Sequence, residues 1–220
     1  MTTSQTKAVK TTSSVRTIYL TSYNTTFALL WSYILISTLT HVHHNGISST
    51  KLFSSLEPSA RWIQTLSLLD VLHAATSLIP APFGSTFTQV VTRVIQVWLI
   101  WFMFPSTTTT AARGYAFPAL LLAWSTADMI RYAYLALNLH GKAPKWLVWL
   151  RYSMFYALYP VGIGAEWWLM YRAIESAGES SMWLKRVFYF LLASYVPGAY
   201  SMFTYMIKQR RKTLAKLRRE

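Results

Sequence analysis

The chain has 220 residues, of which 53% are hydrophobic and 16% aromatic, and only seven are acidic. This composition is too apolar and too poor in acids for an ordinary soluble domain of this length. The net charge of +14 does not indicate a nucleic-acid partner, because seven of the 21 basic residues lie within 208–219, after the last apolar segment. The lack of cysteine excludes disulfides, thiol nucleophiles and zinc–thiolate sites.

Six apolar segments follow a polar N-terminal stretch, and each is close to the ~20 residues that a helix needs to cross a bilayer. They lie at residues 18–39, 61–79, 86–104, 117–139, 146–171 and 182–207. The pattern predicts an all-α polytopic membrane protein, a bundle of six transmembrane helices within a domain at 17–207. We expect residues 1–16 to form a disordered tail and residues 208–220 a basic tail.

An even number of spans places both termini on the same side of the membrane. The basic C-terminal tail and a short turn with Lys142 and Lys145 assign that side to the cytosol, because cytosolic flanks are enriched in Lys and Arg. The polar connections at 40–60, 105–115 and 175–181 then face the lumen.

In chain order, the spans differ in the polar residues that they carry. The first is rich in Thr and Ser, the second carries Asp70 and His73, and the fourth carries Asp128 and Arg131. Charged side chains are costly inside a bilayer, so we expect them to pair within the bundle. In each pair the two residues are three positions apart on one helix face, and we interpret all four as structural.

Arginines in the third and fifth spans allow two interpretations. Arg93 and Arg151 can pair with intramembrane acids, or their forked guanidinium groups can hold a phosphate or carboxylate of an acidic substrate. Neither interpretation is favoured by the sequence.

The fifth span contains a phenol and a carboxylic acid in otherwise apolar and aromatic sequence. Seven positions come within about 20° of two full helical turns, so Tyr159 and Glu166 share a helix face, about 10.5 Å apart along the axis. Pro160 predicts a kink between them. A carboxylate at membrane depth indicates a functional site, and a structural hydrogen bond between Tyr159 and Glu166 is the alternative.

Other signals are weaker. His41, His43 and His44 have no nearby Cys or acid to complete a metal shell, so we predict no metal site. Residues 73–80, HAATSLIP, faintly resemble a tyrosine-phosphatase loop but lack its Cys nucleophile and its Arg, so no phosphatase chemistry is expected. No Gly-rich phosphate loop occurs, and we predict no cofactor.

Short motifs extend through most of the chain, and the most specific is Tyr159-Pro160-x-Gly162-x-x-x-Glu166. The others are Tyr19-Leu20-x-x-Tyr23-Asn24 with Trp31, Leu69-Asp70-x-x-His73, Gln89-Val90-Val91-Thr92-Arg93 with Trp98, Trp124-Ser125 with Ile130-Arg131-Tyr132, Arg151-Tyr152-x-x-Phe155, Pro197-Gly198 and Tyr205-Met206-x-Lys208-Gln209-Arg210. On these motifs the chain resembles the very-long-chain (3R)-3-hydroxyacyl-CoA dehydratases, also called protein-tyrosine-phosphatase-like A proteins. Asp70 and Asp128 depart from the Glu that is usual in the family.

The resemblance implies a hydro-lyase that converts a very-long-chain (3R)-3-hydroxyacyl-CoA to a trans-2-enoyl-CoA. This is a step of fatty-acid elongation, which supplies very-long-chain fatty acids and sphingolipid precursors. The resemblance also implies that Tyr159 and Glu166 are the catalytic pair. We hypothesise that Glu166 removes the C2 proton and Tyr159 protonates the leaving hydroxyl, with the reversed assignment as an alternative.

The same resemblance implies a multi-pass protein of the endoplasmic reticulum, with elongase and reductase enzymes as partners. We expect the acyl chain between the helices and the CoA head near Lys142 and Lys145, with Arg93 or Arg151. Residues 216–220 loosely resemble a basic retrieval signal, although an ordinary cytosolic flank explains them as well.

Two other functions remain as alternatives. The chain can be a catalytically inactive scaffold of the elongation machinery, in which the intramembrane charges serve assembly alone. It can also be a proton-coupled transporter that relays protons through Asp70, Asp128 and Glu166.

Overall fold

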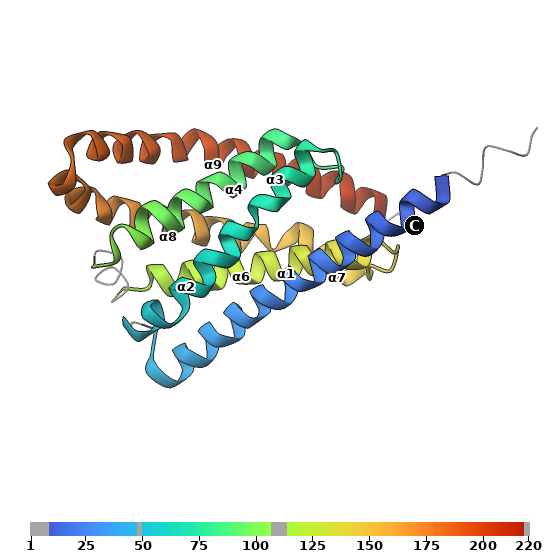
Figure 1. Cartoon of the computed structure of the whole chain (residues 1–220), viewed down its shortest axis with the longest axis horizontal. Coiled ribbons are helices and arrows are strands. Elements are labelled where there is room, and N and C mark those ends of the chain that lie inside the picture. The colour runs from blue at the N-terminus through green and yellow to red at the C-terminus, as the bar shows by residue number, and fades with distance from the viewer. Residues whose placement is uncertain (1–8, 48–49, 107–113, 218–220) are drawn as a thin grey trace, which may run out of the picture.

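The computed structural model describes residues 9–47, 50–106 and 114–217, and its regular elements in these ranges are all helices (Figure 1). This agrees with the predicted all-α class. The helices are α1 (Val9–Asn45), α2 (Thr50–Leu66), α3 (Leu68–Ala75), α4 (Phe83–Ile95), the π-helix η1 (Gln96–Phe102), α6 (Ala116–Asn138), α7 (Lys145–Ser153), α8 (Phe155–Ser180) and α9 (Met182–Leu217).

Each predicted span corresponds to one helix or to two consecutive helices. The first, fourth and sixth correspond to α1, α6 and α9; the second, third and fifth correspond to α2–α3, α4–η1 and α7–α8. At the first of these breaks, the Ser67 hydroxyl donates to the Gln64 carbonyl at 2.6 Å, a bond that competes with the helical ladder. α8 continues as a helix through Pro160, and the break in this span lies at Met154.

Two of the connections predicted between the spans are shorter in the structure than the sequence indicated. α1 continues to Asn45 and ends at Gly46, whose φ of +77° is the left-handed conformation that glycine adopts at helix ends. The predicted connection at 40–60 is therefore largely helical, because polar residues continue a helix until such a residue stops it. The predicted connection at 175–181 is reduced to Ser181, where the backbone is extended between α8 and α9.

Helices also extend into both predicted tails. α1 begins at Val9, and α9 continues to Leu217. Residues 1–8 and 218–220, and most of the predicted connection at 105–115, lie outside the described residues.

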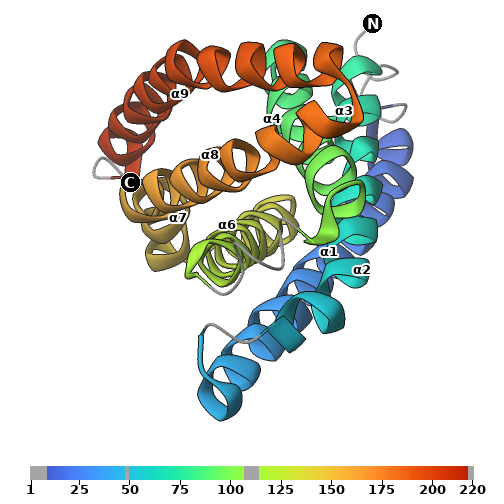
Figure 2. The ribbon, with the colours of Figure 1, turned by 90° about the vertical axis from the view of Figure 1, so that its left-hand side faces the viewer.

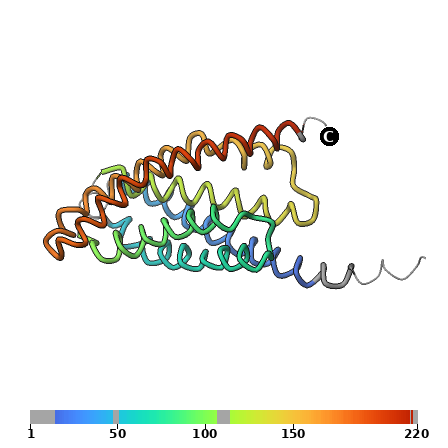
Figure 3. The backbone as a smooth tube through the Cα atoms, turned by 90° about the horizontal axis from the view of Figure 1, so that it is seen from above, coloured from blue at the N-terminus to red at the C-terminus, as the bar shows by residue number. Residues whose placement is uncertain are grey.

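The central helix of the bundle is α6. It packs along α1 on one side and along α8 on the other, and α8 packs against α9; Figure 2 shows this succession in end view. Figure 3 shows α8 and α9 running in opposite directions, side by side. The core between these helices is aromatic, with Trp31, Trp101, Phe117, Trp124 and Tyr132 fully buried.

The outer surface of the bundle is apolar. Two helical stretches, Val15–Asn45 in α1 and Met182–Ala215 in α9, are long and apolar enough to cross a membrane. Both expose large apolar side chains, for example Leu29 at 66% and Phe190 at 72% exposure. Such surfaces are unfavourable in water and favourable in lipid, so these two helices indicate a membrane protein. The other four predicted spans do not form candidates of this kind among the described residues: three are interrupted between consecutive helices, and the remaining one, in α6, contains Asp128 and Arg131.

Candidate active site

Glu166 lies on α8 with only 4% of its surface exposed. Its Oε1 accepts a hydrogen bond from the Trp124 indole Nε1 on α6 at 2.7 Å, and its Oε2 accepts one from the Tyr195 hydroxyl on α9 at 3.1 Å. No ion pair to Glu166 is formed within the described part of the chain. The carboxylate is therefore held by neutral donors from two neighbouring helices.

The close approach of α8 to α6 occurs one turn before Glu166. A Cβ atom placed on Gly162 would lie 3.8 Å from the Ala123 Cβ and 3.9 Å from the Trp124 Cδ1. Gly162 and Glu166 are four positions apart and share a face. This face of α8 therefore rests on Ala123 and Trp124, which brings the carboxylate to the indole.

Tyr159 is half-buried on α8, and its contacts are with α9. Its hydroxyl donates to the Ala199 carbonyl at 3.3 Å, and its ring stacks on Phe203 with the centroids 5.9 Å apart. Because Tyr195 and Ala199 are one turn apart on α9, Tyr159 and Glu166 both face that helix. The shared face expected from the sequence is present, whereas the alternative of a direct hydrogen bond is not, since each group bonds to α9 instead.

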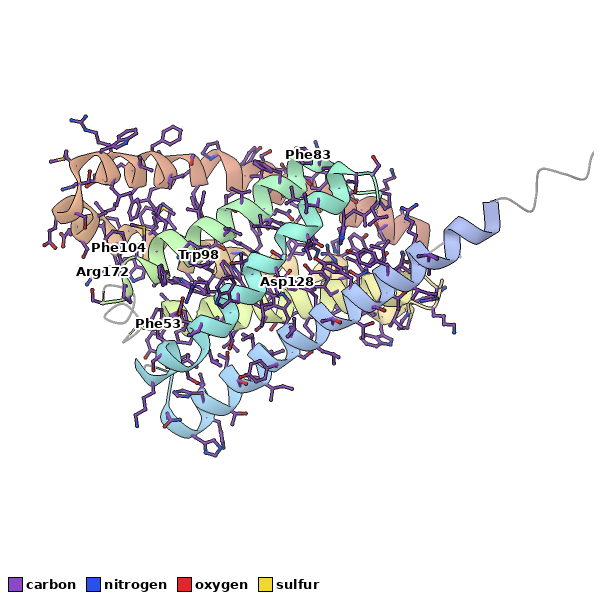
Figure 4. The ribbon with its side chains drawn as sticks, viewed as in Figure 1. Phe53, Phe83, Trp98, Phe104, Asp128 and Arg172 are labelled. Atoms are coloured by element: carbon purple, nitrogen blue, oxygen red, sulfur yellow. The ribbon has the colours of Figure 1, made fainter. Side chains whose placement is uncertain are left out.

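Four charged residues of the predicted spans form ion pairs around Asp128, which is labelled in Figure 4 and lies one turn from Trp124 on α6. Arg93 forms an ion pair with Asp128, and its guanidinium carbon lies 4.8 Å from the centre of the Trp124 ring. Arg131 contacts Asp128 at 3.7 Å, which is the expected pair within one helix, and also Asp70 at 2.6 Å. The Trp124 indole thus contacts both the Glu166 carboxylate and Arg93 of the charged network.

Asp70 and His73 are bound by different partners. The Asp70 carboxylate accepts hydrogen bonds from the hydroxyls of Tyr23 and Tyr132, each at 2.8 Å, besides the contact with Arg131. The His73 Nε2 lies 2.8 Å from the Tyr19 hydroxyl. Both residues therefore connect α3 to α1, and Asp70 also connects it to α6, which fits a structural role.

The four basic residues that were predicted to bind the CoA headgroup of the substrate do not lie together. Arg93 is occupied by Asp128, which is ten residues, or about 15 Å, from the end of α6. Lys142 is exposed in the turn beyond that end, and Lys145 is exposed at the start of α7. Arg151 on α7 lies 5.6 Å from the centre of the Tyr152 ring and has no ion pair among the described residues.

Some polar contacts were not foreseen from the sequence. Glu57 is buried and bonds Arg61 at 2.6 Å, a pair four residues apart whose spacing is a recognisable signal. Trp124 lies in a quoted motif, but no local pattern connects it, or Tyr195, to Glu166. Among the described residues, no group of three or more His, Cys, Asp and Glu side chains is placed to hold a metal ion.

The family model described as "Protein tyrosine phosphatase-like protein, PTPLA" matches residues 64–216. The chain belongs to this family. The matched region contains Tyr159 and Glu166 together with Trp124 and Tyr195, so the whole candidate site lies within the PTPLA region.

Curated relatives of this PTPLA protein match it over nearly its full length. A rice protein, very-long-chain (3R)-3-hydroxyacyl-CoA dehydratase PASTICCINO 2A (Oryza sativa subsp. japonica), is 34% identical over 218 residues, which covers 93% of this chain and 96% of the relative. The dehydratase hpo-8 of Caenorhabditis elegans is 35% identical, covering 91% and 96% of the two chains. PASTICCINO 2 of Arabidopsis thaliana, also named as such a dehydratase, is 32% identical, covering 94% and 98%. No solved structure matches the chain.

Proposed function

We propose that this PTPLA protein dehydrates very-long-chain (3R)-3-hydroxyacyl-CoA to trans-2-enoyl-CoA in the fatty-acid elongation cycle. The proposal is supported by relatives that carry this activity in their names and match almost the full chain. The observation that carries it is a buried carboxylate with two neutral donors, facing the same neighbouring helix as a phenol.

The geometry favours Glu166 as the base. An indole N–H can only donate a hydrogen bond, so the Oε1 atom that it contacts is an acceptor. The Tyr195 hydroxyl likewise donates its hydrogen bond to Oε2. This arrangement suits an ionised carboxylate that is ready to receive a proton from C2. The Tyr159 hydroxyl is protonated and donates a long hydrogen bond of 3.3 Å to the Ala199 carbonyl. It can rotate away from that carbonyl and donate its proton to the C3 hydroxyl of the substrate. Elimination then forms the C2–C3 double bond and releases water.

The bilayer supplies the environment for the acyl chain. Each buried CH₂ group contributes about 0.8 kcal/mol, so a very long chain favours the apolar interior between helices. The phosphates of CoA belong at the end of the bundle where Lys142 and Lys145 are exposed and where Arg151 has no acidic partner within the described ranges.

We also propose that all six spans cross the membrane of the endoplasmic reticulum, with both termini in the cytosol. In support, the spans other than α1 and α9 also expose large apolar side chains, among them Leu72, Phe102, Leu137 and Val161. Elongase and reductase enzymes are the proposed partners. Replacing Lys216 and Arg218 by Ser tests the retrieval signal, and unchanged localisation would discard it.

The experiment that tests the function is turnover of a long-chain 3-hydroxyacyl-CoA by the purified protein, followed by chromatography of the enoyl product. Glu166→Gln and Tyr159→Phe should each lower the rate by about 100-fold or more, as expected for loss of an acid–base group. Matched controls on the same helix are Glu175→Gln and Tyr171→Phe, both exposed. Near-normal turnover by either site variant would refute the role proposed for that residue.

The same experiment separates the alternatives. A scaffold predicts no turnover by the wild-type protein. A proton-coupled transporter needs acids that exchange protons freely, whereas Asp70 and Asp128 are both held in ion pairs.

A further inference from the structure

Tyr195 is the phenol that bonds directly to Glu166. Its hydroxyl lies 3.1 Å from Oε2, whereas the Tyr159 hydroxyl bonds to the Ala199 backbone. The Tyr159 hydroxyl nevertheless reaches α9 only four positions, or one turn, from Tyr195. The site therefore contains two phenols and one carboxylate along the interface of α8 and α9.

The register of these antiparallel helices places Tyr195 between the two proposed catalytic groups. On α8, Tyr159 and Glu166 are about 10.5 Å apart along the axis. On α9, the residue that contacts Tyr159 is only four positions, or about 6 Å, from Tyr195. The Tyr195 side chain extends from this intermediate level to the carboxylate, so its backbone lies between the levels of the two groups and its hydroxyl lies next to Glu166.

The proposed reaction leaves both groups in the wrong protonation state after one turnover. Glu166 has gained the C2 proton, and Tyr159 has lost its proton to the leaving hydroxyl. A second turnover requires a proton to move from Glu166 to the Tyr159 phenolate, and the two groups form no direct hydrogen bond.

The two donors to Glu166 differ in their ability to carry this proton. The Trp124 indole N–H can donate but has no lone pair to accept a proton, whereas a phenol oxygen both donates and accepts. We propose that Tyr195 relays the proton from Glu166 to Tyr159 after each turnover. In this structure the Tyr159 hydroxyl bonds to the Ala199 carbonyl and not to Tyr195. Once Tyr159 turns from that carbonyl to Tyr195, the Tyr195 oxygen accepts the proton of the Glu166 carboxylic acid while its own proton passes to the Tyr159 oxygen, which restores the carboxylate and both phenols.

This inference rests on the proposed function and is tested by comparing the first turnover with the steady state. Enoyl formation is followed by rapid mixing with a stoichiometric amount of a long-chain 3-hydroxyacyl-CoA and then with an excess. In Tyr195→Phe, the first turnover should slow only as much as in Trp124→Phe, which loses the other donor to Glu166, while the steady-state rate falls about 100-fold below the first-turnover rate, the range of a lost proton-transfer group. The product should therefore appear in a burst of one equivalent per active site.

Two variants give matched comparisons. Trp124→Phe removes the other donor and should slow the first turnover and the steady state equally, without a burst. Tyr200→Phe removes an exposed hydroxyl of the same helix and should change neither rate. Tyr195→His restores a group that both accepts and donates a proton, so it should recover part of the steady-state rate lost in Tyr195→Phe.

The outcomes are distinct. Equal slowing of both phases in Tyr195→Phe, or no slowing, overturns the relay, and so does a Tyr195→His variant that is slower than Tyr195→Phe. If the wild-type protein makes no enoyl product, or Glu166→Gln keeps normal activity, the proposed function itself fails. A wild-type enzyme that depends on Glu166 but not on Tyr195 refutes the relay alone.

Discussion

Replacement of Asp70 by alanine tests the polar network that joins α1, α3 and α6. The carboxylate is 3% exposed and accepts hydrogen bonds from Tyr23 and Tyr132 at 2.8 Å and from Arg131 at 2.6 Å. Alanine removes all three bonds. Arg131 then retains only the 3.7 Å contact with Asp128 among the ion pairs of the described chain.

The size of the effect follows from these contacts. Loss of one partner of a buried ion pair costs about 3–5 kcal/mol in soluble proteins, while polar contacts between membrane helices contribute roughly 0.6–1.7 kcal/mol each. With three bonds lost together, we expect Asp70→Ala to lower the free energy of unfolding by about 3 kcal/mol. Asp70→Asn keeps the shape and one acceptor oxygen, so we expect about half of that loss.

The assay is unfolding of the purified protein in mixed micelles with an increasing fraction of SDS, followed by tryptophan fluorescence. Combining Asp70→Ala with Arg131→Met should cost no more than Asp70→Ala alone, because the unpaired buried cation is removed with its partner. Glu175→Gln, at an exposed acid, is the control. A loss below about 0.5 kcal/mol for Asp70→Ala, or additive losses in the double variant, would refute the reasoning.

Two further predictions concern the end of α1 and the substrate head. Gly46→Ala should destabilise the protein by about 1 kcal/mol, because the φ of +77° at Gly46 is unfavourable for alanine. The control is Gly84→Ala in α4, where there is open space for the added methyl group, and this variant should be at least as stable as wild type. Equal effects of the two substitutions in the same unfolding assay would contradict this explanation. Arg151→Gln should raise KM for the acyl-CoA about tenfold, equivalent to about 1.4 kcal/mol, with little change in kcat. Arg172→Gln, at an exposed arginine of α8, serves as its control, and an equal rise in KM for both variants would argue against a specific headgroup contact.

Several features of this protein followed from local sequence. Tyr159 and Glu166 share a face of α8 because seven residues make almost two helical turns, whatever the rest of the fold does. The contact between Arg131 and Asp128 follows from their spacing in the same way. The apolar segments also indicated the all-α class, because the bilayer requires long apolar helices.

Only the tertiary structure decided which groups meet across helices. The donors to Glu166 are 42 and 29 positions away in the chain, on α6 and α9, and no periodicity within α8 predicts them. Packing likewise paired Arg93 with Asp128, so that it is not free for an acidic substrate. Helical periodicity determines the face on which a side chain lies, but the partner of that face depends on how separate helices pack, which is a property of the whole chain.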